Sequence, residues 1–485
     1  MCARPVLERF HASRVRSALV SRGCAPALSL LAVLSLMATA GCNGDAPTTA
    51  SRNLLFVVFD TTRADHLGCY GYDGRPTSPT VDRLAREGVV LENAYSASTL
   101  TPVSAGSFLS GTLPYRHGVR SLFVVGEESL AGDVPALFEL LGEGERATSA
   151  FVSAKPMGGH YGLGRGFDLY QDDLSQTLQD YGIEQFGDAP QRPGDATTDL
   201  AVEWLRENGT RPFATMVHLF DAHDMSFVPP REFLDQHLGL PIPAELGRAW
   251  DRNPLANLEE LKALYDVEIL FMDAQLQRLL DLLDELGVRD ETLIVFLADH
   301  GESFGEHGYF SHGWLSEEQL RVPVVMAGPG LVSSTRLTER VRTVDLVPTL
   351  CELFGLDIPA GLDGSSVLGL LRGEEEDFPR EVYAEVHHAP GDPRGREANM
   401  YTVIEGDWKY IHRPATKSHE LYNLRLDPGE SDNRFGSKPR VGARLARSLL
   451  ERGALGSGGV SLEGLTAEQI RDLQALGYLG EVGQE

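Results

Sequence analysis

The chain has 485 residues and a formal net charge of −27 at pH 7, which disfavours general nucleic-acid binding and charge-driven binding to anionic membranes. Its length allows one large domain with a smaller one beside it. Only Cys69 and Cys351 follow Cys42, so a disulfide framework is not expected. An anionic substrate would need a local device, such as a metal ion, to offset the acidic field.

The first 41 residues have the features of an export signal. Arginines at positions 4, 9, 14, 16 and 22 precede a short apolar run, residues 25–38, which ends in Thr39-Ala40-Gly41-Cys42. Small residues before a cysteine resemble a bacterial lipoprotein cleavage site. We therefore expect a signal peptide over 1–41, a tether over 42–51, and a lipid anchor on Cys42 as the only membrane attachment. Thr39 stands where Leu is usual, so ordinary cleavage to a periplasmic or extracellular protein stays open.

Strands and helices are expected to alternate from the first apolar run onward. Asn53–Phe59 is apolar throughout and closes on Asp60, which is typical of a strand buried on both faces. A helix begins with Ser78 as its N-cap and Pro79 as its first residue, and Gly88 stops it. Further strands are expected at Val89–Tyr95, Ala147–Val152, Phe213–Leu219, 293–298 and 322–327, and further helices at 134–141, 195–207, 258–286 and 344–354.

This alternation predicts an α/β fold with a doubly wound, mostly parallel sheet flanked by helices. We assign residues 52–375 to this catalytic domain. Residues 376–485 are expected to form a smaller subdomain with an antiparallel sheet and a helix. Its predicted strands are 382–386, 401–405 and 408–412, with Gly406-Asp407 as a hairpin turn, and its predicted helix runs from Thr466 to Gly477.

Two buried strands that end in acids carry the predicted chemistry. Asp60 closes the first, and Asp299 closes the strand at 293–298, with His300 next to it. Thr101 precedes a short helical turn at 104–109, where backbone N–H groups favour an anion. Three oxygens and one nitrogen suit one divalent ion such as Mg²⁺, Mn²⁺, Ca²⁺ or Zn²⁺. The ion would lower the pKa of the Thr101 hydroxyl and make it a nucleophile, although a simple helix cap remains the alternative.

Histidines follow at two further points. His218, Asp221 and His223 lie at the exit of the strand Phe213–Leu219. They could protonate a leaving group or hold a second metal, or form a salt-bridged surface loop. His312 lies between Ser311 and Gly313, close in sequence to Asp299, which favours a role in the site.

Taken together, these motifs resemble the sulfatase family within the alkaline-phosphatase superfamily. The resemblance covers about residues 51–480 and rests on five stretches in the family's order. They are Val-Val-Phe-Asp60-Thr-Thr-Arg63, Thr101 to Gly111 with Pro114-Tyr-Arg-His117, His218 to His223, Asp299-His300-Gly301-Glu302 with His312 and Arg321-Val-Pro, and Val344-Asp345-Leu-Val-Pro with Gly361-Leu-Asp-Gly364.

The resemblance implies residue roles. Asp60, Asp299 and His300 would bind the metal, and Thr101 would be both ligand and nucleophile. His223 and His312 would contact the transferred anion and the leaving oxygen. The further candidates for substrate binding are His117, Arg63 and His218.

The chain departs from the family where sulfatases carry Cys-x-Pro-x-Arg and convert the Cys to formylglycine. Thr101, Val103 and Ala105 hold the Cys, Pro and Arg positions, so no formylglycine is expected and the bidentate arginine clamp on the anion is missing. Thr61 replaces the second Asp of the family's strand-end pair, and Lys155 has no partner histidine in a Lys-x-His pair. A threonine ester cannot collapse to an aldehyde, so water or another acceptor must attack it directly.

The sequence therefore predicts an exported, metal-dependent ester hydrolase with Thr101 as the nucleophile. Its substrate would be a sulfate ester or, in preference, a phosphodiester or phosphonate ester. Relatives with Thr at this position include phosphoglycerol and phosphoethanolamine transferases, so transfer to a sugar or lipid hydroxyl is the alternative. A catalytically inactive metal-binding lipoprotein is the third interpretation.

Overall fold

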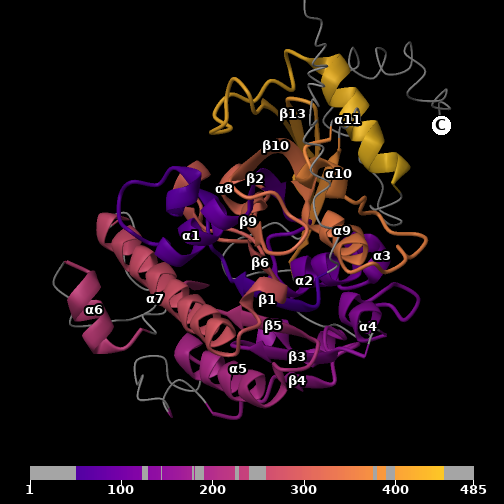
Figure 1. Ribbon diagram of the computed structural model, residues 1–485. Coiled ribbons are helices and arrows are strands. Elements are labelled where there is room, and N and C mark those ends of the chain that lie inside the picture. Colours follow the sequence, from indigo (N-terminus) through magenta and orange to yellow (C-terminus); the bar gives the residue numbers. More distant parts are fainter. Residues whose placement is uncertain are drawn as a thin grey trace, which may run out of the picture. The chain divides into compact units, whose positions relative to one another are not determined.

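The main sheet has eight strands in the order β10-β2-β9-β6-β1-β5-β3-β4 (Figure 1). The computed structural model describes residues 51–122, 129–143, 145–176, 180, 191–223, 229–239, 258–374, 380–388 and 399–452, all within one compact unit. The strands are β1 (Asn53–Phe59), β2 (Val89–Tyr95), β3 (Ala147–Val152), β4 (Leu169–Gln171), β5 (Phe213–Leu219), β6 (Thr292–Ala298), β9 (Arg321–Ala327) and β10 (Thr335–Arg342).

Strand β1 lies at the centre of this sheet and is buried on both faces. It pairs in parallel with β5 on one side and with β6 on the other. Leu54, Phe56 and Val58 pack into one apolar cluster, and the alternate residues of β1 pack into a second. Because neither face of β1 meets solvent, the strand is apolar throughout rather than alternating.

Helices cover the two faces. The first cluster is covered by α2 (Thr101–Ser110), α4 (Leu137–Gly142) and α9 (Leu346–Leu353). The second is covered by α1 (Pro79–Glu87), α5 (Gly194–Asn208) and α7 (Leu258–Glu285), which lie together on the other side of the sheet (Figure 1). The other α-helices among the described residues are α3 (Pro114–His117), α6 (Arg231–His237), α8 (Glu317–Leu320), α10 (Leu368–Leu371) and α11 (Pro439–Glu451).

The 3₁₀ turns in the described part of the chain are Ala64–His66, Gly68–Tyr70, Lys155–Met157, Gly159–Tyr161, Arg289–Glu291, Glu306–Gly308 and Thr343–Asp345.

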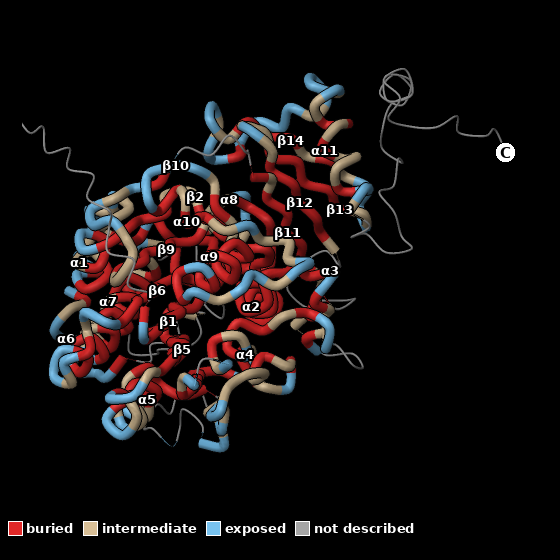
Figure 2. Tube along the Cα trace, turned by 45° about the vertical axis from the view of Figure 1, so that its right-hand side comes forward, coloured by how far each residue is buried: buried red, intermediate tan, exposed pale blue. Residues whose placement is uncertain are grey.

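A second, antiparallel sheet has the order β11-β12-β13-β14. Its strands are β11 (Val382–His387), β12 (Asn399–Glu405), β13 (Trp408–Arg413) and β14 (Ser418–Asn423). Helix α11 packs on it through Leu445 and Leu449, against Tyr383, Tyr410 and neighbouring apolar residues. Figure 2 shows these strands as buried for most of their length. The predicted fold class, a mostly parallel α/β sheet with a smaller antiparallel sheet, is confirmed.

Four predicted strands, including β1 and β5, have the bounds of the structure, but several helices differ. Helix α4 begins at Leu137 rather than at 134, because Pro135 disfavours helical geometry in the residue before it. Helix α2 begins at Thr101 rather than at 104. The expected helix at 344–354 begins as a 3₁₀ turn, Thr343–Asp345, and becomes α9 at Leu346.

Ser78 is the N-cap residue of α1 and Pro79 its first residue, as predicted, but the Ser78 side chain makes no capping hydrogen bond. Its hydroxyl donates to Asp82 and accepts from the Gly68 N–H. The Asp273 carboxylate, from α7, instead accepts the N–H groups of Thr80 and Val81 at the start of α1. A tertiary contact therefore satisfies the helix terminus.

Some predictions concern other parts of the chain. The signal peptide, the Cys42 anchor and the helix at 466–477 lie outside the described residues, and the domain boundary at 375/376 stays a prediction. None of the described helices has both the length and the apolar composition needed to cross a membrane.

Candidate active site

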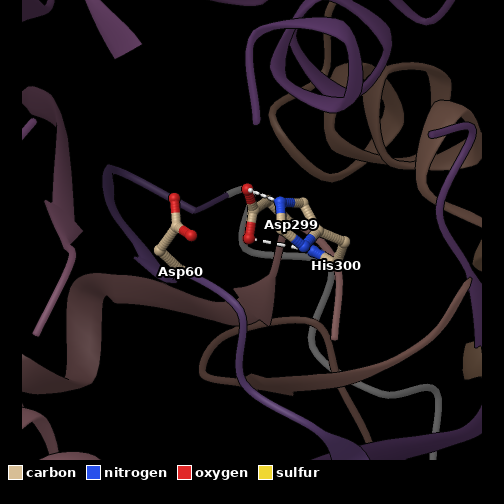
Figure 3. A group of neighbouring side chains, drawn as sticks. All are labelled: Asp60, Asp299 and His300. Carbon is tan, nitrogen blue, oxygen red and sulfur yellow. Dashed lines mark hydrogen bonds and ion pairs between the residues drawn. The ribbon is translucent and has the colours of Figure 1, made fainter. Parts of the chain in front are cut away.

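The register of two parallel strands brings the predicted acids together. Phe59 pairs with Ala298 at the carboxyl ends of β1 and β6, so the next residues, Asp60 and Asp299, leave the sheet side by side. Both side chains are fully buried, and His300 lies against Asp299 (Figure 3). One ligand atom from each of Asp60, Asp299 and His300 lies within 4.8 Å of the others. The sheet thus assembles the three residues predicted to bind metal.

Helix α2 delivers Thr101 to this cluster. The Thr101 hydroxyl lies 3.3 Å from Asp60 Oδ2 and 3.4 Å from His300 Nε2. The Ser104 hydroxyl, one turn further on, donates to the Asp299 carbonyl oxygen at 2.8 Å, which ties α2 to the end of β6. Gly111, at φ 69°, ends the helix, as glycine does most easily in the left-handed region.

The hydrogen bonds of the two carboxylates leave a position open for a cation. Asp299 Oδ1 accepts from the backbone N–H groups of Thr61 and His300, at 3.1 and 2.9 Å. Asp60 Oδ1 has no hydrogen-bond partner among the described residues, and Asp299 Oδ2 makes no hydrogen bond there but lies 3.3 Å from His300 Nε2. A buried carboxylate oxygen without a hydrogen bond is costly, and these two oxygens with the imidazole form a donor set that fits a divalent ion.

The raised pKa of Asp60 also favours a divalent cation at this site. Burial, and next the negative charge of Asp299, hold the pKa of Asp60 well above its usual range. Two buried carboxylates at this spacing repel each other unless a positive charge lies between them. A divalent cation would supply that charge.

Three histidines surround the cluster. His218, at the end of β5, lies with Nε2 3.0 Å from Asp60 Oδ2, and burial lowers its pKa to about 4. The His312 ring lies between two others, with its centroid 4.6 Å from that of His300 and 4.8 Å from that of His223. His218 and His312 therefore contact residues of the Thr101 cluster, and His223 lies beyond the His312 ring.

Two of the residues predicted to bind substrate, His117 and Arg63, make contacts within the protein. His117 Nε2 lies 2.9 Å from the Ser107 hydroxyl, later in α2, and burial lowers the His117 pKa to about 3. The buried Arg63 guanidinium pairs with Asp65 and Glu306 at 2.7 and 2.8 Å. His117 thus supports α2, and Arg63 holds the loop that follows β6.

The structure also places Asp221, Lys155, Thr61 and the predicted helix cap at Thr101. Asp221 accepts from the Gly194 N–H at the start of α5, at 3.0 Å, and burial raises its pKa to about 7. Lys155 is exposed. Thr61, in place of the family's second Asp, has a left-handed backbone with φ 52°, which is unusual for a β-branched residue. The predicted helix cap at Thr101 is not formed by its side chain, because Leu100 occupies the N-cap position.

Sequence reasoning gave no role to two residues that shape the site. Tyr265, from α7, donates its hydroxyl to the Thr61 carbonyl at 2.7 Å and accepts from the Arg63 N–H at 2.8 Å. Glu302 lies with Oε2 3.3 Å from His312 Nδ1. Only the position of Glu302 just after Asp299-His300-Gly301 could have drawn attention to it.

Comparison with known proteins identifies the family. The family model described as Sulfatase matches residues 52–356, and that of the N-sulphoglucosamine sulphohydrolase C-terminal region matches residues 305–452. An N-acetylglucosamine-6-O-sulfatase of Bacteroides thetaiotaomicron is 24% identical, over 84% of this chain and 87% of its own length. A choline-sulfatase of Rhizobium meliloti is 26% identical, over 81% and 84%.

A solved structure supports the fold. The phosphonate monoester hydrolase of Agrobacterium radiobacter superposes with a TM-score of 0.67 at 21% identity, over 82% of this chain and 95% of that one. With a family model that spans more than half of its length, the chain belongs to the sulfatase family of ester hydrolases.

Proposed function

We propose that this protein is an exported, metal-dependent hydrolase that uses Thr101 as its nucleophile. The observation that carries the proposal is the position of the Thr101 hydroxyl, 3.3 Å from Asp60 Oδ2 and 3.4 Å from His300 Nε2. A divalent ion bound by Asp60, Asp299 and His300 would lower the pKa of that hydroxyl and stabilise negative charge on the transferred group.

The residues around Thr101 would divide the remaining work. His218 holds Asp60 through Nε2, so it would orient a metal ligand. His223 and His312 have adjacent rings and would contact the anion and the leaving oxygen. Ala105 offers no positive charge, so these imidazoles and the backbone N–H groups at the start of α2 would bind the anion in place of an arginine clamp.

A phosphodiester or phosphonate ester is the substrate class that this chemistry favours. A sulfate on threonine cannot leave by collapse to an aldehyde, whereas in-line attack of water on phosphorus needs only a base and charge stabilisation. One structural relative is named a phosphonate monoester hydrolase. Because other relatives are named sulfatases, a sulfate ester is the second candidate substrate.

Export rests on the arginines and the apolar run that precede Cys42. An envelope or extracellular ester is therefore the proposed setting. A lipid anchor on Cys42 would retain the enzyme at the membrane surface.

The test is turnover of aryl sulfates, phosphodiesters and phosphonates by the purified protein with Mn²⁺, Ca²⁺, Mg²⁺ or Zn²⁺. Thr101→Ala is the inactive control, and Thr101→Ser should keep part of the activity because it keeps the hydroxyl. We expect Thr101-dependent release of alcohol into water. A product formed mainly on an added sugar or lipid hydroxyl would indicate a transferase, and no Thr101-dependent turnover would refute the proposal.

A further inference from the structure

A cavity of about 590 Å³ lies between the β10 edge of the main sheet and the antiparallel sheet. Tyr95 at the end of β2, Arg321 at the start of β9 and Arg340 in β10 line it from one side. Gly406 and Arg425, in the turns after β12 and β14, line it from the other (Figure 1). Its volume lies in the range of small-molecule binding sites.

The charge of the lining is opposite in sign to that of the chain. Acids outnumber Lys and Arg by 70 to 43 in the whole sequence, which repels anions from most of the surface. The cavity lining instead holds more positive than negative side chains. They are Arg321, Arg340, Arg380 and Arg425 against Glu317, Glu339 and Asp407.

Two of the four arginines are paired with carboxylates. Arg425 lies 2.8 Å from Asp407, and Arg380 lies 3.6 Å from Asp345. Their charge is therefore offset within the protein. The other two arginines differ in this respect.

Arg321 and Arg340 have no carboxylate partner among the described residues. Arg321 donates through Nε and Nη2 to the Glu92 carbonyl oxygen, at 3.0 and 2.8 Å. Arg340 donates through Nη2 to the Gly406 carbonyl oxygen at 2.7 Å and lies over the Tyr95 ring, while its buried Nε makes no hydrogen bond in the described chain. Because a guanidinium has five N–H groups, both arginines keep donors for a ligand.

One of the acids in the lining also has a positive partner outside it. Glu317 lies 3.1 Å from the Nζ atom of the buried Lys409, so its charge is offset as that of Asp407 is. Glu339 is exposed and has no ion pair within the described residues. The unpaired charges of the lining are therefore two guanidinium groups and one exposed carboxylate.

We propose that this cavity is a binding site for a tetrahedral oxyanion, a sulfate, phosphate or phosphonate group, whose oxygens accept hydrogen bonds from Arg321 and Arg340. Guanidinium groups match such anions in charge and in the geometry of their paired donors. The volume also has room for a sugar-sized carrier of the group.

The site is separate from the candidate active site. Strands β9 and β6 lie between β2 and β1, so Tyr95 and Asp60 follow strands that are about 14 Å apart, at about 4.8 Å for each neighbouring pair. The inference uses neither Thr101 nor its metal and therefore goes beyond the proposed function.

The test is equilibrium dialysis of the purified protein with ³²P-phosphate or ³⁵S-sulfate, at constant ionic strength and with excess chelator. The chelator removes metal from the Asp60 cluster. We expect saturable binding of one anion per chain, unchanged in Thr101→Ala. Competition with glucose 6-phosphate distinguishes two sources of the anion: tighter binding than that of inorganic phosphate indicates a group carried on a sugar, and equal binding indicates the free ion.

Variants of the lining should change this affinity in both directions. Arg321→Gln and Arg340→Gln should each weaken binding by about tenfold or more, because each removes charge-assisted hydrogen bonds. Glu339→Gln removes an exposed, unpaired negative charge and should tighten binding by about twofold. Arg336→Gln is the matched control, because Arg336 also lies in β10 but pairs with Glu92 outside the cavity, and it should change the affinity by less than about twofold.

Three results would overturn the proposal. The first is the absence of saturable binding in chelator. The second is equal affinity in the wild type, Arg321→Gln, Arg340→Gln and Glu339→Gln; the last of these replaces an exposed side chain, so the comparison does not depend on the folding of the arginine variants. The third is binding that requires metal or is lost in Thr101→Ala, because it would place the anion in the candidate active site.

Discussion

Replacing Asp299 with asparagine removes a charged ligand and leaves the local backbone supported. Asp299 Oδ1 accepts the N–H groups of Thr61 and His300, whereas Oδ2 makes no hydrogen bond in the described chain and lies 3.3 Å from His300 Nε2. The asparagine oxygen can keep the two N–H bonds, which turns its NH₂ group toward the cation position. The substitution therefore replaces one metal ligand by a hydrogen-bond donor.

The expected loss follows from ligand linkage. At a metal concentration of about 100 times Kd, binding stabilises the folded wild type by about 2.7 kcal/mol. Loss of even an outer-shell partner weakens metal affinity by about 10- to 100-fold, so we take about 100-fold as a minimum for Asp299→Asn. At the same metal concentration the variant would then gain only about 0.4 kcal/mol.

The metal-free protein should respond in the opposite direction. Burial is the largest cause of the raised pKa of Asp60, and the negative charge of Asp299 is the second. Removing the Asp299 charge therefore relieves a repulsion between two buried carboxylates. In excess chelator, Asp299→Asn should be at least as stable as the wild type.

The assay combines three measurements. They are the calorimetric Tm, with chelator and along a metal titration, the metal content by mass spectrometry, and the ester turnover. We expect metal content, the metal-induced rise in Tm, and activity to fall together in Asp299→Asn. Wild-type metal content and an unchanged rise in Tm would refute the assignment of Asp299 as a ligand.

Three further predictions concern the support of the site. In Gly106→Ala the new methyl would lie 2.6 Å from the His117 ring, so a change that usually favours a helix should instead cost about 1–3 kcal/mol in chemical denaturation; an unchanged midpoint would contradict it. Arg120→Ala removes the 2.6 Å ion pair of the buried Glu385 carboxylate and leaves it with His387 at 3.6 Å and the Tyr383 hydroxyl, which should cost about 3 kcal/mol, with part recovered by adding Glu385→Gln. Burial raises the pKa of Asp221 to about 7, so the folded state keeps a proton that the unfolded state releases at lower pH. Relative to Asp221→Asn, the free energy of unfolding of the wild type should therefore fall by up to about 4 kcal/mol as pH rises from 4 to above 7. A difference between the two proteins that does not change with pH would contradict this.

The position of the site could be predicted because the site lies at the ends of strands whose sequences are apolar throughout, rather than alternately apolar and polar. Asn53–Phe59 and the run that ends before Asp299 favour strands buried on both faces of a parallel sheet, whose parallel strands end at one edge. That predicts Asp60 and Asp299 at the same edge, and the pairing of β1 with β6 shows that they are neighbours. The helix that follows Thr101 was predicted too short, because its small, uniformly buried residues show no amphipathic period.

The contacts around the site could not be predicted in the same way. Arg63 and His117 are close in sequence to Asp60 and Thr101, but whether they turn toward the substrate or toward the scaffold depends on partners far along the chain, such as Glu306. Strand β10 was missed because its sequence is polar, as suits an edge strand. Helix α11 was missed although its buried residues Gly442, Leu445 and Leu449 recur at helical spacing.

The central claim is that Thr101 forms a covalent ester with the transferred group. Rapid quenching of the metal-loaded protein during turnover, followed by peptide mass spectrometry, tests it most directly. We predict a phosphoryl, phosphonyl or sulfo adduct on the peptide that contains Thr101, absent from Thr101→Ala. Steady turnover with the adduct on another residue, or equal turnover by Thr101→Ala, would contradict it.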